Sequence, residues 1–260
     1  MAELRVENLS VEADGLYLLS AINLTLGPGE LIVVIGENGA GKSTLLRAIA
    51  DYQPGTTGYV TLDGVTVATL SGSQRARAMA WLPQSIPLAW PIRVHDAVAL
   101  GRFAYGALPG RLSADDAAAV ARALDATELT SFVARTTATL SGGELARVHI
   151  ARALASEAPI LIADEPIAAL DPRHRLAVMD AIAGHVRAGG SALVVLHDLM
   201  LAARYASKII GMRGGRIMVA GSVDDVMTPE WIRCLFGVDA RIDRIGGRPV
   251  PIVVGTAETL

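Results

Sequence analysis

The sequence has one cysteine, few aromatic side chains and no long apolar run among its 260 residues. The single thiol, Cys234, excludes a disulfide within the chain, and its neighbours Trp231, Ile232 and Leu235 predict a buried thiol with a packing role. No uninterrupted apolar stretch approaches the roughly 20 residues that a membrane-spanning helix needs. Residues 1–7 alternate charged and apolar side chains, which predicts a strand and not a secretory signal, so we expect a cytoplasmic chain.

A basic run is also absent, and the formal net charge is -3. We therefore expect no nucleic-acid-binding surface, because such surfaces concentrate lysine and arginine against phosphates. Low-complexity segments and internal repeats are lacking as well. A chain of this length can bury a large core and forms one large domain or two small ones.

A glycine-rich loop is the strongest motif that is present. It follows the apolar run Leu31–Ile35 and precedes a helical pattern, which is the setting of a phosphate-binding loop of the form G-x-x-x-x-G-K-[ST]. Its residues are Gly36, Glu37, Asn38, Gly39, Ala40, Gly41, Lys42, Ser43 and Thr44. Backbone N–H groups of such a loop point at one anion, while Lys42 reaches the β- and γ-phosphates and Ser43 offers its hydroxyl to Mg2+. A plain β-to-α turn is the alternative, but the motif with these flanks favours nucleoside triphosphate binding.

Two carboxylates follow a second apolar strand, Ile160–Ala163. This position places Asp164 and Glu165 at the edge where α/β sheets bind ligands. In a phosphate-loop enzyme the first acid assists Mg2+ and the next polarises the attacking water. Adjacent acids in a turn are common, so this interpretation depends on the phosphate loop.

The segment Leu140–Glu144 contains Ser141, Gly142, Gly143 and Glu144. Ser141 and Glu144 have the spacing of a helix capping box, and the glycines ease entry into the helix. A capped helix N-terminus can also bind an anion such as a γ-phosphate. Since the chain already has its own phosphate loop, a second anion site suggests that two copies meet across a dimer.

The remaining pattern predicts an α/β fold with a phosphate-loop NTPase core and a mostly parallel sheet. We expect an antiparallel β subdomain at the N-terminus, with a hairpin around Asp63-Gly64, and helical patterns over Val94–Leu100 and Ser113–Leu124. The proposed division is an ATP-binding core with its β subdomain over 1–84 and 145–238, a helical subdomain over 85–144 and a C-terminal extension over 239–260. Further strands are expected at Met79–Leu82, Ala192–Leu196, Lys208–Met212 and Arg216–Ala220.

The motifs together resemble the ATP-binding cassette family of ATPases, and the resemblance covers nearly the whole chain. It rests on the phosphate loop and, in the family's order, on Gln84, Leu140–Glu144, Asp164-Glu165-Pro166, the D-loop segment ending at Asp171, and His197. The resemblance implies a head-to-tail homodimer that holds two ATP molecules with Mg2+, each between one copy's phosphate loop and the other's Ser141 segment. It also implies that His197 bonds the γ-phosphate and that Gln84 senses Mg2+ and water. Taken singly, Asp171 is also a good helix start, His197 a strand-end histidine and Gln84 a loop amide.

A finer resemblance is to ATPase subunits of importers for iron-siderophore complexes, haem and cobalamin. It rests on Leu82–Gln84, Val98–Arg102 and His197–Tyr205. It implies a peripheral subunit on the cytoplasmic face of the inner membrane, which drives a separate permease and works indirectly with a periplasmic substrate-binding protein. Zinc or manganese importers, exporters, and soluble cassette ATPases of iron-sulfur assembly or DNA repair are the alternatives.

The sequence departs from the family pattern at three places. Ile167 stands where threonine is frequent, and the residues after Glu144 lack the usual glutamine. Ala13 occupies the place of an aromatic residue that stacks on adenine, which makes Tyr17 the candidate for that contact.

The apolar segment Ile86–Ile92 follows Gln84 and carries prolines that forbid a regular helix or central strand. The resemblance places it where a permease helix docks, so Leu88, Trp90 and Ile92 are expected at that interface. The alternative is a tryptophan packed in the core.

Overall fold

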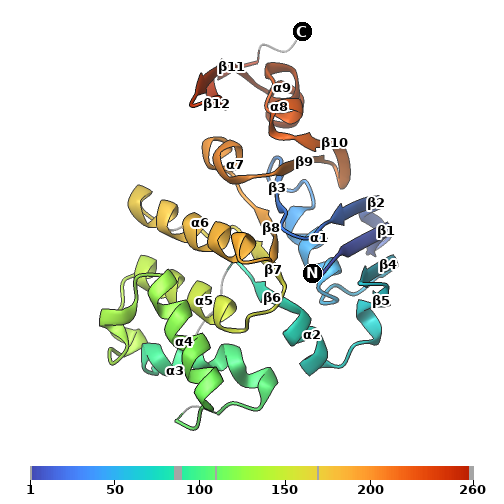
Figure 1. Cartoon of the computed structure of the whole chain (residues 1–260). Coiled ribbons are helices and arrows are strands. Elements are labelled where there is room, and N and C mark those ends of the chain that lie inside the picture. The colour runs from blue at the N-terminus through green and yellow to red at the C-terminus, as the bar shows by residue number, and fades with distance from the viewer. Residues whose placement is uncertain (1, 85–89, 109, 169, 258–260) are drawn as a thin grey trace.

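The computed structural model describes residues 2–84, 90–108, 110–168 and 170–257. Its centre is a six-stranded sheet in which β6 to β9 and β3 run parallel and β10 runs antiparallel to β9 (Figure 1). The order across the sheet is β10 (Arg216–Ser222), β9 (Lys208–Arg213), β3 (Leu31–Ile35), β8 (Ser191–Val195), β7 (Ile160–Asp164) and β6 (Met79–Leu82). The expected α/β class with a mostly parallel sheet is confirmed.

The three middle strands are buried on both faces, which explains their unbroken apolar sequences. On one face Ile32 and Val34 pack with α1 (Lys42–Ile49) and with the N-terminal β subdomain. On the other face Val33 and Val194 pack against α6 (Pro172–Arg187) and α7 (Leu199–Tyr205). Two layers therefore hold the strand ends, and with them the site residues, in fixed positions.

The N-terminal β subdomain is a four-stranded antiparallel sheet, as the sequence predicts. Its order is β2 (Leu16–Leu26), β1 (Leu4–Ala13), β4 (Thr56–Leu62) and β5 (Val65–Thr66). The turn at Asp63-Gly64 joins β4 to β5, and Asp63 adopts a positive φ of 49°. The following helix α2 (Gly72–Ala78) was not expected, because it has no buried residue and therefore no apolar periodicity to reveal it.

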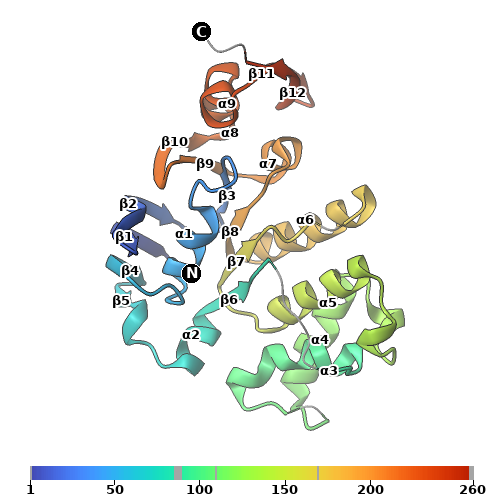
Figure 2. The ribbon, with the colours of Figure 1, turned by 180° about the vertical axis from the view of Figure 1, so that it is seen from behind.

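The helical subdomain lies apart from this sheet, below α6 in Figures 1 and 2. It contains α3 (Val94–Ala99) and α4 (Ala114–Ala126), and α5 (Gly142–Ala155) packs against both. Ser113 caps α4 by accepting a hydrogen bond from the N–H of Asp116, as expected. One side of α5 packs with α3 and α4 through Val148, whereas Ile150 packs into the central core. This helix thus joins the two parts of the fold.

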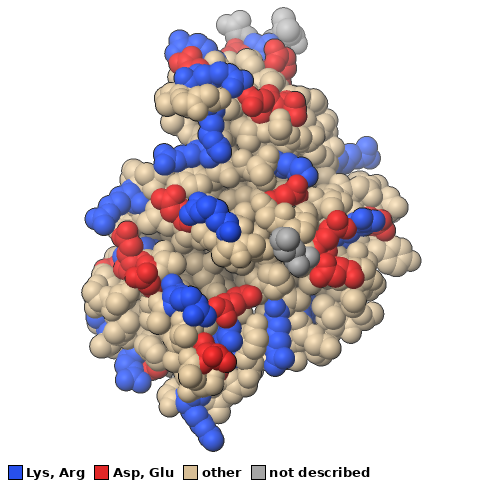
Figure 3. Space-filling model, in the orientation of Figure 1, with Lys and Arg blue, Asp and Glu red and all other residues tan. Residues whose placement is uncertain are grey.

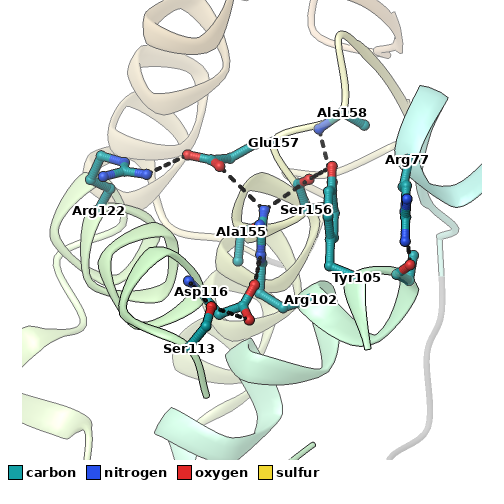
Figure 4. Close-up of polar contacts among 11 residues, drawn as sticks. Arg77, Arg102, Tyr105, Ser113, Asp116, Arg122, Ala155, Ser156, Glu157 and Ala158 are labelled. Atoms are coloured by element: carbon teal, nitrogen blue, oxygen red, sulfur yellow. Dashed lines mark hydrogen bonds and ion pairs between the residues drawn. The ribbon is translucent and has the colours of Figure 1, made fainter. Parts of the chain in front are cut away.

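A buried ion pair braces the helical subdomain (Figure 4). The Arg102 guanidinium lies 2.8 Å from Asp116 Oδ1, and both side chains are buried. Arg102 also donates to the carbonyls of Ala155 and Ser156 at the end of α5 and stacks 3.8 Å from the ring centroid of Tyr105. The pair therefore ties α4 to the C-terminal end of α5, which makes the subdomain rigid relative to that helix.

The C-terminal residues form structure that the sequence did not reveal. After α8 (Val223–Val226) and α9 (Pro229–Phe236), β11 (Val238–Ile245) and β12 (Arg248–Thr256) make an antiparallel hairpin at the opposite end of the molecule from α3 (Figures 1 and 2). The expectation of a buried thiol was wrong, because Cys234 is only half-buried. Ile232 and Leu235 fill the buried face of α9 and leave Cys234 on its flank.

Positive and negative side chains alternate over the face shown in Figure 3, with no field of one sign. Within the described ranges, no helix is both long and apolar enough to span a bilayer.

Candidate functional site

The phosphate loop joins β3 to α1 and depends on glycines with positive φ. Gly36 has φ of 149°, and a Cβ there would lie 2.2 Å from the carbonyl oxygen of Met212. Gly41, at the N-cap of α1, has φ of 94° and lies against Leu19. Only glycine combines this conformation with this close approach. The loop therefore opens the N-terminus of α1 toward solvent, where an anion can bind.

The Lys42 side chain is hydrogen-bonded to the backbone of this loop. Its Nζ donates to the carbonyl oxygens of Gly36, at 2.7 Å, and Glu37, at 2.8 Å. Burial lowers the pKa of the Lys42 ammonium, while the Glu165 and Asp164 carboxylates oppose that shift. The lysine is thus buried, oriented by the loop itself and placed to meet phosphate oxygens.

Ser43 and Asp164 form an oxygen pair beside the loop. The Ser43 hydroxyl donates to Asp164 Oδ1 at 3.2 Å, although the two residues come from α1 and β7. Burial raises the pKa of Asp164. The hydrogen bond from the Ser43 hydroxyl opposes this shift, and repulsion from the Glu165 carboxylate adds to it. Hydroxyl and carboxylate oxygens are the ligands that Mg2+ prefers, so this pair fits that ion together with phosphate oxygens.

The Glu165 carboxylate is hydrogen-bonded to two other residues singled out in the sequence. Its Oε2 accepts from Gln84 Nε2 at 2.9 Å, and its Oε1 is hydrogen-bonded to His197 Nε2 at 2.5 Å. These side chains follow β7, β6 and β8, which are neighbouring strands of the sheet. Glu165 has a positive φ of 51°, a conformation that costs about 1–3 kcal/mol for a non-glycine residue and is frequent at functional sites.

One open cleft of about 900 Å3 is lined by Lys42 and Ser43 together with Gln84, Glu165 and His197. Tyr17 and Leu18 also line it, and Tyr17 is 66% exposed. The sequence analysis missed Gly214 and Gly215, which line the same cleft. The visible signal was a Gly-Gly turn between two predicted strands. The described residues of the cleft also include the loop residues Asn38, Gly39, Gly41 and Thr44.

The Ser141 segment lies elsewhere. Ser141 caps α5, with Glu144 completing the capping box, as predicted. Gly142 is exposed, and a Cβ there would contact nothing within 4 Å. Asp171 is likewise exposed and caps α6 by accepting from the N–H of His174. In the described part of the chain, none of these residues lines the cleft of the phosphate loop.

The expected docking residues have different surroundings. Trp90 is 69% exposed, as the surface interpretation requires. Ile92 is half-buried against the core of the helical subdomain, and its backbone N–H donates to the Thr137 hydroxyl. Leu88 lies outside the described residues.

A groove between α2 and the helical subdomain was missed. It has a volume of about 590 Å3 and includes Tyr52, Trp81 and Phe103 in its lining. Phe103 is 66% exposed, and the only sequence signal was an aromatic residue next to the Val98–Arg102 motif.

A parallel sheet in which β3 feeds a phosphate loop, and in which paired acids lie at the end of β7 on the other side of β8, defines a phosphate-loop nucleoside triphosphatase. Residues 19–168 match the family model described as ABC transporter. The chain therefore belongs to the ABC transporter family, as an ATP-hydrolysing subunit.

Two relatives align with most of the chain. The chain is 40% identical to the hemin import ATP-binding protein HmuV of Pseudomonas aeruginosa, over 96% of this chain and 99% of the relative. It is 42% identical to HmuV of Streptomyces coelicolor, over 84% of this chain and 77% of the relative. Among solved structures, a dimeric ATP-binding cassette in a post-hydrolysis state with ADP and phosphate is 28% identical, with a TM-score of 0.73 over 85% of this chain and 98% of the other.

Proposed function

We propose that this chain powers the import of haem through a separate membrane permease. The observation that carries the proposal is the cleft in which Lys42, Glu165 and His197 converge, in a chain similar over nearly its whole length to hemin import proteins. The same relatives favour transport over soluble roles in iron-sulfur assembly or DNA repair, and favour haem over zinc or manganese. Iron-siderophore complexes and cobalamin are the next candidates.

The cleft suits the triphosphate of ATP. The backbone N–H groups from Gly39 to Thr44 and the Lys42 ammonium provide donors for the β- and γ-phosphates. Ser43, Asp164 and Gln84 would hold Mg2+, which neutralises developing phosphate charge when bound. Tyr17, which lines the cleft, would stack on adenine in place of the aromatic residue absent at Ala13.

Glu165 is the proposed general base. Its carboxylate is held by Gln84 and His197, so its two oxygens already point into the cleft. When the γ-phosphate enters, His197 can turn from Glu165 to the phosphate and Gln84 to the magnesium site. The freed carboxylate then accepts a proton from the attacking water.

Each site is completed by a second copy of the chain. Ser141 and Gly142 present an exposed, capped helix N-terminus that is remote from the cleft of the same chain. A helix terminus of this kind favours an anion. The dimeric cassette with ADP and phosphate supports a homodimer. In the proposed arrangement, the Ser141 segment of one copy faces the ATP of the other, with Asp171 nearby.

The groove that includes Phe103 and Tyr52 is the proposed docking site for a permease helix, with exposed Trp90 at the edge of the helical subdomain. An exposed aromatic residue in a groove is typical of an interaction surface. The subunit would then sit on the cytoplasmic face of the inner membrane, and a periplasmic binding protein would deliver haem from the other side.

The proposed division of the chain keeps 1–84 and 145–238 as the ATP-binding core, 85–144 as the helical subdomain and 239–260 as the C-terminal extension. Its boundary at 144/145 falls within the first turn of α5, the helix that packs on both sides.

The direct test is uptake of haem by proteoliposomes that contain this chain with its permease and binding protein. We expect uptake that requires ATP and Mg2+ and stops in Lys42→Ala. Uptake of a ferric siderophore or cobalamin in place of haem would refute the proposed substrate while leaving the ATPase function intact.

Docking has its own test. Phe103→Ala should reduce co-purification with the permease by tenfold or more, since truncating a central aromatic contact costs about 2 kcal/mol. Its melting temperature and basal ATPase activity should stay near those of the parent, because the side chain is exposed. Comparison with Trp90→Ala shows which of the two aromatic residues carries the interface.

A further inference from the structure

The second half of β12 exposes an apolar strand that the proposed function does not use. Ile252, Val253 and Val254 are consecutive and all exposed, and Val254 is 65% accessible. No residue from Ile252 to Thr256 is charged. The facing strand β11, by contrast, carries charged residues such as Asp239 and Arg241.

The backbone of this segment is also open for pairing. The hairpin sheet has only two strands, so in the described part of the chain β12 has no strand on its other side. Pro249 and Pro251 lack N–H groups and are buried, which restricts pairing in the first half of the strand. From Ile252 onward that restriction ends. Natural edge strands normally carry charges or prolines to prevent association, and this half carries neither.

The exposed segment adjoins the ATP site. A cleft of about 580 Å3 separates β12 from the start of α7 and is lined by His197, Met200 and Val253 among others. His197 also lines the cleft of the phosphate loop. The apolar surface is therefore continuous with the face that the proposed dimer covers, and Met200, 58% exposed, extends it.

We infer that the Ile252–Thr256 half of β12 is a contact between two copies of this chain in the ATP-bound dimer. The inference rests on the proposed composite ATP site, which turns the His197 side of each copy toward its partner. In a two-fold dimer both copies use the same surface for the interface, so a patch on that surface contacts the partner. An uncharged apolar patch creates no repulsion in such a contact, and its burial adds to the stability of the dimer.

The test uses Val253→Asp in the Glu165→Gln background, where hydrolysis does not consume ATP. Val65→Asp is the matched control, because Val65 is 49% exposed in an edge strand of the other sheet, compared with 54% for Val253. We expect Val253→Asp to raise the dissociation constant of the ATP-dependent dimer at least tenfold in analytical ultracentrifugation. Binding of ATP to the monomer and the melting temperature should match those of the control.

Equal dimerisation of Val253→Asp and Val65→Asp would overturn the inference alone. Absence of ATP-dependent dimers in the Glu165→Gln parent would overturn the composite site and this contact together.

Discussion

Replacing Glu165 with glutamine tests the central chemical assignment. The amide has almost the same shape as the carboxylate, and its oxygen can still accept from Gln84, which lies 2.9 Å from Glu165 Oε2. It cannot accept a proton from water. Asp164 and Ser43 are untouched, so nucleotide binding should persist.

The expected loss of hydrolysis rate follows from the role of Glu165 as the general base. General-base catalysis by a positioned side chain contributes about 10²–10⁴ in rate, which corresponds to about 3–5 kcal/mol of activation free energy. The structure places Glu165 in the cleft with both oxygens oriented, so we expect a loss of at least about a hundredfold. The substitution also removes a negative charge near the γ-phosphate position. The ATP-bound dimer should therefore live longer than that of the parent.

Steady-state phosphate release measures the rate, and size-exclusion chromatography with ATP measures the dimer. Glu128→Gln is a suitable control, since it makes the same chemical change at an exposed position whose carboxylate pairs with exposed Arg173. Turnover near the parent rate in Glu165→Gln would refute the reasoning and leave Glu165 a structural turn residue.

Three further predictions concern the composite site, adenine and stability. Ser141→Arg should abolish hydrolysis by blocking the partner's site. Mixing Ser141→Arg chains with Lys42→Ala chains should restore ATP-driven association, because the heterodimer has one intact site. No association in the mixture would mean that Ser141 is only a helix cap. Tyr17→Ala should weaken ATP binding by about 1 kcal/mol, or roughly fivefold in a titration, and GTP should also serve because stacking hardly discriminates bases; unchanged affinity would exclude stacking. Arg102→Gln should lower the melting temperature by about 5 °C or more, because it leaves the buried Asp116 carboxylate without its cation. Arg5→Gln, at an exposed ion pair, should change the melting temperature little.

The sequence alone determined the parts of the site that are local in the chain. The phosphate loop from Gly36 to Thr44 is recognisable because its donors are successive backbone groups, so spacing and glycine content describe it completely. The caps at Ser113, Ser141 and Asp171 were predicted for the same reason, since each cap bonds a backbone N–H only three residues away.

Tertiary structure decided what depends on distant segments. Gln84 and His197 meet Glu165 only because β6, β7 and β8 are neighbours in the sheet, an order that no local pattern specifies. The Gly214-Gly215 turn reaches the cleft because Ser20 in β2 donates to Gly215 across most of the chain. The exposure of the hairpin of β11 and β12 also depends on tertiary structure. Whether Val253 faces a core or solvent depends on which elements pack against it, and only the folded chain leaves it exposed beside His197.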